Sequence, residues 1–584
     1  MKRFVAVLAL LLLACNDRGA ERAPASETAA QKSFREVSDR TLEQLFALVP
    51  ELGSALGDHT RDGELWFPDA AGVRVAVAFA REAEELLGAF EPAQLSQQER
   101  VERAAWLQNL KGMLFALEVQ RVHQREPRFY TDALDVAQFV AKDYAPLAQR
   151  ARALAKHADA GVRVLALAEQ QLEPKLPHAG LEVAIGMTRG GVSFLRGDIP
   201  LALEPLGEDP ARADALAASE RLAVAAEKYA AFLEARLPAA DASYALGEPA
   251  LLRMLRETEG LDLTSAQIEA TCRAEIDRDS AALAEAAQQI DAKREVEAVV
   301  ASVLSERLPP AEVIPFARQK VEELRKLIVE KQLASIPADD PLIVTESPAY
   351  MRQAFAFLSS GGPLEPRAVE SHYYITPPEP SWPPAKQREF VMPTATLLDV
   401  SAHEAFPGHF LHAIFGRRIE PRTLRALAGM GSILTVEGWG LYAEEIAWEA
   451  GDRNPRDRVG QLAESLLRGA RCLSSLGLHI KGWSVDDATR TFEEVAHQSP
   501  TSAREEALRG TSDPMYLGYT LGKAGIRQLR EDVRAKWEAE GRAFTPRAFH
   551  DAFLGYGGVP LPAIREALLA SADAPAASIQ ETAQ

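Results

Sequence analysis

Cysteine is scarce in this sequence. Its 584 residues include only Cys15, Cys272 and Cys472. Three thiols are too few for the disulfide framework of a small secreted scaffold, and no C-x-x-C pair indicates a structural zinc site. Basic residues are also outnumbered, since 65 Lys and Arg stand against 84 Asp and Glu and the formal charge is −19. A nucleic-acid-binding protein needs a basic surface, so this balance argues against that class.

Long apolar runs are lacking beyond the N-terminus, and the one at the start is short. Lys2 and Arg3 precede eleven apolar residues at 4–14. That length is too short for a membrane span and is typical of a secretory signal. The ending L-L-A-C resembles the bacterial lipobox, in which the cysteine, here Cys15, is lipidated. Ordinary signal cleavage near Ala20 is the alternative.

The segment after this cysteine is polar and built of small residues, which suits a flexible tether. We therefore predict a signal peptide at 1–14 and a lipidated N-terminus with its tether at 15–33. The protein is then expected at the bacterial cell envelope, bound to a membrane through its lipid. The sequence does not reveal which membrane, nor the oligomeric state.

Helical periodicity dominates residues 34–335, where apolar residues recur every three to four positions. The pattern changes at 337–396, which hold eleven of the 36 prolines, a residue barred from helix interiors. Short β-prone pieces lie there, at 342–344 and 372–375. Helical patterning then returns from about Ser401.

These patterns predict a mostly α-helical protein with a small β-sheet region near residues 340–400. We expect a single helical domain over 34–572, interrupted by the Pro-rich insertion at 337–400. The final residues, 573–584, are expected to be a disordered tail.

The segment S-A-H-E-A-F-P-G-H-F-L-H carries the most chemistry. His403, Glu404 and His409 resemble the zincin motif H-E-x-x-H, in which two histidines bind zinc and the glutamate activates water. Here the second histidine lies at i+6, about 240° away on a straight helix. Pro407 and Gly408 lie in the gap, where a distorted turn could bring both imidazoles together.

This motif also has simpler interpretations. Ser401 and Glu404 fit a capping box, which would give the glutamate a purely structural role at a helix start. His412 is most simply a surface residue or a residue that supports a ligand.

Two further carboxylates lie in an apolar helical stripe at 430–448. Glu437 and Glu444 are seven residues apart on this stripe. A buried carboxylate is costly unless it is paired or binds metal, so the two fit a third zinc ligand and its supporting partner. Ion pairs with Arg468 or Arg471 are the alternative.

Several motifs together resemble the bacterial domain of unknown function 885 family. They are H-E-A-F-P-G-H at 403–409, E-G-W-G-L-Y-A-E at 437–444 and Y-T-L-G-K at 519–523. D-Y-A-P at 143–146 also matches, whereas S-L-G-L-H at 475–479 departs from the family's usual D-T-G-L-H. The family is similar to helical zincin-type peptidases, namely the thermostable carboxypeptidases and the thimet-type oligopeptidases.

The resemblance implies a role for each matching residue. His403, His409 and Glu437 correspond to the zinc ligands, with Glu444 supporting them. Glu404 corresponds to the general base, which would deprotonate the attacking water. Tyr519 would donate a hydrogen bond to the oxyanion.

Three more residues are candidates for substrate binding. Tyr516 is the rival of Tyr519 as the oxyanion donor. His479 and Arg471 could bind a substrate carboxylate or carbonyl, or could form structural salt bridges.

The expected function is an exported lipoprotein zinc hydrolase that acts on a peptide substrate. One alternative is an amidase or another hydrolase that uses the same metal site. The other is an inactive peptidase fold that binds a ligand without turnover.

Overall fold

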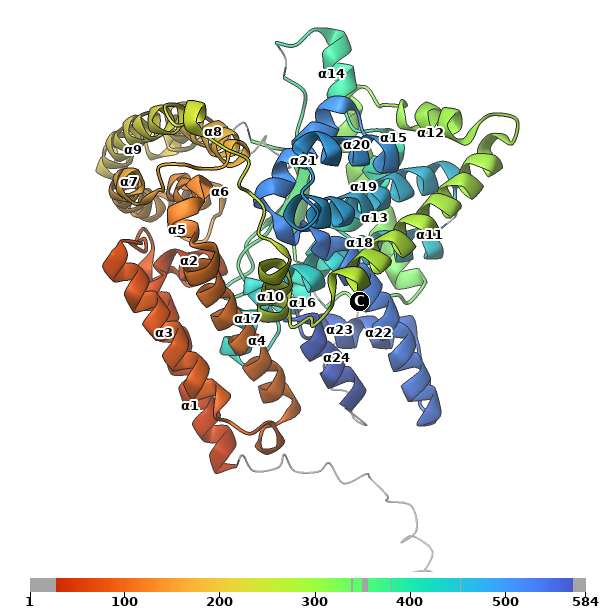
Figure 1. The fold of residues 1–584 in the computed structure, drawn as a ribbon, viewed down its shortest axis with the longest axis horizontal. Helices are drawn as coiled ribbons and strands as arrows, with labels where there is room; N and C mark the ends of the chain where they lie inside the picture. The colour runs from red at the N-terminus through yellow and green to blue at the C-terminus, as the bar shows by residue number, and fades with distance from the viewer. Residues whose placement is uncertain (1–27, 338–339, 349–354, 380, 452, 571–584) are drawn as a thin grey trace, which may run out of the picture.

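The computed structural model describes residues 28–337, 340–348, 355–379, 381–451 and 453–570. It is predominantly α-helical with one small three-stranded sheet, as the sequence predicts (Figure 1). The signal peptide, Cys15 and the tail at 573–584 lie outside these residues. Within them, no helix combines the length and apolarity that crossing a membrane requires.

The first third of the chain consists of helices joined by short turns. They are α1 (Ala29–Leu48), α2 (Pro50–Leu56), α3 (Ala70–Gly88), α4 (Gln97–Leu114), α5 (Val122–Arg125), α6 (Gln138–Ala141), α7 (Leu147–Gln171), α8 (His178–Ala202) and α9 (Pro210–Glu234). Helix α1 begins before residue 34, the expected start of the domain. The reason is a capping box in which Thr28 and Gln31 satisfy each other's backbone N–H groups. The last five residues of the tether predicted at 15–33 therefore belong to α1.

Helices α7, α8 and α9 form a separate three-helix unit. Leu154, Leu181 and Leu222, one from each helix, are fully buried in a shared hydrophobic core. In Figure 1 this unit lies to one side of the C-terminal helices. The helical structure of this unit agrees with the periodicity of residues 34–335.

The middle of the chain continues with long helices and then forms the sheet. The helices are α10 (Glu248–Glu259), α11 (Ser265–Asp291), α12 (Val296–Leu304) and α13 (Pro310–Glu330), and the strands are β1 (Leu342–Glu346), β2 (Ala356–Ser359) and β3 (Ser371–Ile375). The strand order is β1-β3-β2, with β1 parallel and β2 antiparallel to β3. Strand β2 is therefore an edge of the sheet, and among the described residues only β3 pairs with it as a strand.

The remaining helices carry the motifs. They are α14 (Pro384–Phe390), α15 (Thr394–Glu404), α16 (His409–Gly416), α17 (Arg422–Met430), α18 (Ile433–Ala450), α19 (Pro455–His479), α20 (Val485–Ala496), α21 (Pro500–Ser512), α22 (Gly518–Ala539), α23 (Pro546–Leu554) and α24 (Leu561–Ala570). Helix α15 starts before Ser401, where helical structure was expected to return. Pro393 is the N-cap residue of α15, a position that proline can occupy because it is excluded only from helix interiors.

A glycine–glycine contact and a disulfide hold helices together around the C-terminal core. Gly438 of α18 faces Gly522 of α22, and a Cβ atom at Gly438 would lie 2.5 Å from the Gly522 Cα atom. Cys272 of α11 and Cys472 of α19 form a disulfide across 200 residues. Nothing in the sequence pattern indicates this pairing. Such a crosslink stabilises a fold by about 2–5 kcal/mol and persists in oxidising compartments, in line with export.

A partly buried ionic cluster contains the tyrosine of the D-Y-A-P segment. The His59 ring stacks on Tyr144 at 3.6 Å between centroids and contacts the carboxylates of Asp62 and Glu365 at 3.0 and 3.2 Å. Burial lowers the pKa of His59, but the two carboxylates outweigh it and raise that pKa to about 9.

We expect this cluster to make stability depend on pH. The protonated imidazole contributes fully below pH 6.5, the ordinary pKa, and its contribution is lost as pH rises through about 9. After allowance for solvent screening, the free energy of unfolding should fall by about 1–2 kcal/mol over this window. Urea unfolding across pH 6–10 measures the fall. His59→Gln should flatten it, and an equal fall in that variant would contradict the assignment.

Candidate metal centre

The H-E-x-x-x-x-H segment is divided between two helices. Helix α15 ends at Glu404 and α16 begins at His409, so the straight helix is interrupted as the spacing requires. A Cβ atom at Gly408 would collide with the carbonyl oxygen of His403, so only glycine fits this close return. The Trp439 indole N–H anchors the turn by donating to the Pro407 carbonyl at 3.0 Å.

The capping-box interpretation of this segment is wrong. Ser401 lies inside α15, not at its start, and its hydroxyl donates to the Leu397 carbonyl at 2.7 Å. Glu404 is at the C-terminal end of the helix and is free of any N-terminal capping role.

Three side chains converge between α15, α16 and α18. The Glu437 Oε2 atom lies 3.5 Å from Nε2 of His403 and 3.5 Å from Nε2 of His409. All three potential ligand atoms lie within 4.8 Å of one another. Tetrahedral zinc with bonds of about 2.0–2.2 Å separates neighbouring ligand atoms by about 3.3–3.5 Å. Two imidazoles and one carboxylate in this arrangement therefore fit a zinc ion.

The charge of Glu437 suits a cation site. Burial raises its pKa, but interactions with His403 and His409 outweigh burial and hold the pKa well below its usual range. The carboxylate is thus ionised at neutral pH and available as a ligand.

Glu444 supports the site from behind His403. Its Oε1 atom lies 2.6 Å from Nδ1 of His403, which leaves Nε2 directed towards Glu437. Glycine at 440 makes room for the imidazole, since a Cβ atom there would lie 2.6 Å from its Cε1 atom. Such a carboxylate partner fixes the tautomer and orientation of a metal-binding histidine.

A second buried carboxyl group stands behind this pair. Asp399 is almost fully buried, one helical turn before His403, and interacts with Glu444. Burial raises the pKa of Glu444 to about 8 and that of Asp399 well above its usual range. Two adjacent buried carboxyl groups therefore resist ionising together.

Glu404 faces the same cavity but does not join the ligand group. Its Oε2 atom accepts a hydrogen bond from the backbone N–H of Leu358 in β2 at 2.9 Å. This contact ties the candidate base to the edge strand of the sheet.

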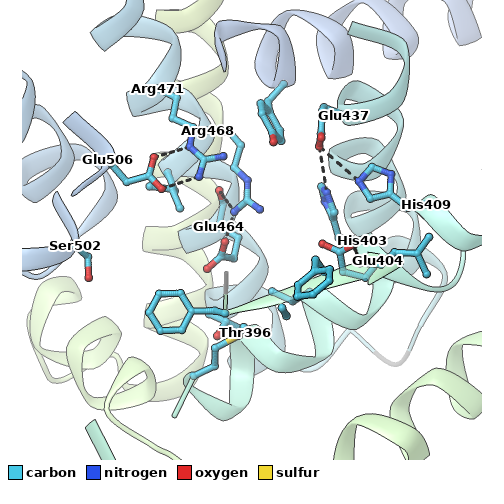
Figure 2. Close-up of a pocket in the computed structure, with 18 of the residues that line it drawn as sticks. Thr396, His403, Glu404, His409, Glu437, Glu464, Arg468, Arg471, Ser502 and Glu506 are labelled. Atoms are coloured by element: carbon cyan, nitrogen blue, oxygen red, sulfur yellow. Dashed lines mark hydrogen bonds and ion pairs between the residues drawn. The ribbon is translucent and has the colours of Figure 1, made fainter. Parts of the chain in front are cut away.

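The candidate metal centre opens into a cavity of about 1520 Å³. Figure 2 shows the histidines and Glu437 on one side, facing a group of ion pairs on the other. These pairs join Arg468 to Glu464, and Arg471 to Glu506 at 2.7 and 2.8 Å. The salt bridges of these two arginines are with Glu464 and Glu506, and not with Glu437 or Glu444 as the alternative required. The charge of Arg468 acts on Glu444 only from a longer distance and lowers its pKa against the larger effect of burial.

The predicted substrate-binding residues separate into two groups. Arg471 and Tyr519 line the cavity, with the Arg471 guanidinium 5.1 Å from the centre of the tyrosine ring. Burial and the charge of Glu437 raise the pKa of Tyr519, so its hydroxyl stays protonated. Tyr516 and His479 are not among the lining residues, contrary to expectation. Both are fully packed, and the His479 ring bonds to the Gly510 carbonyl at 2.8 Å.

Three further residues contribute to the site, and sequence reasoning missed two of them, Asp399 and Leu358. His412 is only 6% exposed, so its interpretation as a surface residue is wrong, and burial lowers its pKa to about 4. The position of Asp399 could have been predicted from the sequence, because it lies four residues before His403 on the same helix face. The role of Leu358 could not have been predicted, since its contribution is a backbone N–H, which every residue except proline has.

Comparisons with known proteins support the fold. A family model for bacterial proteins of unknown function, DUF885, matches residues 50–568. A proposed lipoprotein of unknown function from Shewanella oneidensis aligns with a TM-score of 0.75 at 22% identity, covering 92% of this chain and 100% of that one. A proposed lipoprotein from Colwellia psychrerythraea aligns with a TM-score of 0.72 at 17% identity, covering 93% and 99%.

More distant comparisons add little. A carboxypeptidase from Pyrococcus furiosus aligns with a TM-score of 0.33 at 12% identity over 93% of this chain and 96% of that one, and we draw no argument from it. Curated proteins gave no match.

Proposed function

The chain belongs to the DUF885 family of bacterial proteins of unknown function, and on this premise we propose that it is a zinc-dependent peptidase. The observation that carries the proposal is the convergence of His403, His409 and Glu437 beside Glu404 in one large cavity. The proposal includes export as a lipoprotein anchored to a membrane through Cys15.

Each residue of the centre has a defined task in hydrolysis. When bound, zinc would lower the pKa of water and polarise the scissile carbonyl. Glu404 would accept the proton of the attacking water and pass it to the leaving amine. The Leu358 N–H holds its carboxylate in place for both transfers. The Tyr519 hydroxyl would donate a hydrogen bond to the developing oxyanion.

The edge strand favours a peptide as the substrate. Backbone groups alternate in direction along a strand, and the Phe355 carbonyl accepts from the Thr376 N–H on the β3 side. The Leu358 N–H points the other way, to Glu404. Ala356, two residues earlier, therefore also directs its N–H and carbonyl away from β3. An extended peptide could pair with these groups, as in β-strand addition.

The direct test combines metal analysis with peptide digestion. We expect purified protein to contain about one zinc per chain and to cleave members of a peptide library. A chelator should abolish cleavage, and added zinc should restore it, because the ion supplies the Lewis acid. Metal-free protein that cleaves equally well would refute the proposal. Zinc without cleavage of any peptide would reject the peptide substrate.

The assignment of Tyr519 makes a separate prediction. Tyr519→Phe should lower kcat by about 10²–10³-fold with little change in zinc content, because only one oxyanion donor is lost. Steady-state kinetics on a cleaved peptide measures the effect. Tyr516→Phe is the matched control, because its fully buried hydroxyl lies outside the cavity lining. A larger loss in the control would exchange the two roles.

A further inference from the structure

Three aromatic side chains that are not part of the ligand group gather at one part of the cavity lining. Phe355, Trp382 and Phe390 all line the cavity. The Phe390 ring lies 5.0 Å from that of Phe355 and 5.2 Å from that of Trp382, between centroids. We call these three residues the aromatic cluster. Phe355 is 48% exposed, an unusual exposure for a large apolar side chain in a concave site.

The surroundings of the aromatic cluster give it a polar rim. Lys386 is exposed and holds its ammonium 4.1 Å from the centre of the Trp382 ring. Glu389 is also exposed and lines the same cavity. Both come from α14, which projects from the molecule in Figure 1. An apolar floor with charged edges is the usual form of a pocket for an apolar side chain.

Strand β2 connects the aromatic cluster to the reaction centre. Phe355 directly precedes β2 and lies three residues before Leu358, which bonds Glu404. Three residues of extended chain span about 10 Å. A peptide running antiparallel to β2 would pass Leu358 first and Phe355 later. The peptide residues near Phe355 are then those on the carboxyl side of the scissile bond.

We propose that the aromatic cluster is a specificity subsite for a large apolar, preferably aromatic, side chain of the substrate. That side chain lies two or three residues to the carboxyl side of the cleaved bond. The inference rests on the proposed peptidase function and adds the substrate class to it. A lipid surface is a poorer occupant, because α14 projects from the end of the molecule opposite the start of α1 (Figure 1). Helix α1 is the element that follows the predicted anchor.

Binding is measured first, independently of turnover. Zinc-loaded Glu404→Gln protein is titrated calorimetrically with acetylated alanine heptapeptide amides, in which a single phenylalanine is moved along the chain. We expect one position to bind about 10–100-fold more tightly than the all-alanine peptide, the gain from burying an aromatic ring. Adding Phe355→Ala or Trp382→Ala should remove most of this preference. Adding Phe67→Ala, an exposed phenylalanine outside the cavity lining, should leave it unchanged.

Cleavage by the native protein then locates the preferred position. Mass spectrometry of the products should place the phenylalanine two or three residues after the cut. Unchanged circular dichroism and thermal midpoints show that the alanine variants are folded.

The outcomes separate the two proposals. Phenylalanine preference without any cleavage would support the subsite and reject the peptidase. Cleavage with no preference, or a preference that survives both cavity substitutions, would overturn the subsite and leave the peptidase intact. Loss of binding to phosphatidylglycerol vesicles in Trp382→Ala, with peptide binding unaltered, would also overturn the subsite in favour of a lipid contact.

Discussion

Glu437→Ala should lose zinc almost entirely, whereas Glu444→Ala should weaken zinc binding by only about 10–100-fold. The two carboxylates lie two turns apart on α18 and both contact His403, but on opposite sides of its ring. Glu437 faces Nε2 of both histidines at 3.5 Å, and Glu444 meets Nδ1 of His403 at 2.6 Å. Removal of the first deletes a ligand. Removal of the second only frees the imidazole to rotate.

Metal content by elemental analysis, with affinity from competition against a chelating dye, distinguishes the two effects. Glu449→Ala is the matched control, because Glu449 lies on the same helix with its side chain 44% exposed. This variant should keep the parent affinity. Greater loss of zinc from Glu444→Ala than from Glu437→Ala would exchange the roles, and full retention in both would dismiss the metal centre.

Glu404→Gln should retain zinc and lose activity by about 10²–10⁴-fold, the usual contribution of a general base. Glu404 is outside the ligand group, so the ion has no reason to leave. The glutamine amide oxygen can still accept from the Leu358 N–H, so the local geometry should persist. The substitution removes only the carboxylate that, on the proposed mechanism, would take the proton from water.

Peptide kinetics on zinc-loaded native and variant protein give the ratio directly. Glu505→Gln makes the same chemical change at an exposed glutamate of the cavity lining and should leave kcat within about two-fold, since surface substitutions have small effects. Equal cleavage by native and Glu404→Gln protein would remove Glu404 from the mechanism.

Much of the site could be predicted because its signals are local in the sequence. His403, Glu404 and His409 lie in one short motif, and Pro407-Gly408 indicates the break that separates their helices. The seven-residue spacing of Glu437 and Glu444 placed both on one helical face, and α18 has both of them directed at His403. A carboxylate in an apolar stripe is costly by itself, so its presence indicated a partner.

Local sequence patterns did not predict the direction of a side chain where that direction depended on neighbouring helices. Tyr516 and Tyr519 are three residues apart, yet only Tyr519 reaches the cavity, because Tyr516 belongs to the short turn before α22. His479 likewise turns to the Gly510 carbonyl of α21. Periodicity gives the buried face of a helix but not whether that face meets a core or a cavity.

The sequence by itself determined the helical class, the small sheet and the motif residues of the centre, because these follow from spacing within a few turns of chain. Only the tertiary structure decided which distant groups complete the site. The Leu358 N–H, the Arg471–Glu506 pair and the disulfide of Cys272 with Cys472 all join residues far apart in the chain. Such contacts depend on how whole helices pack, and close packing is set by the shapes of all side chains together rather than by any local pattern.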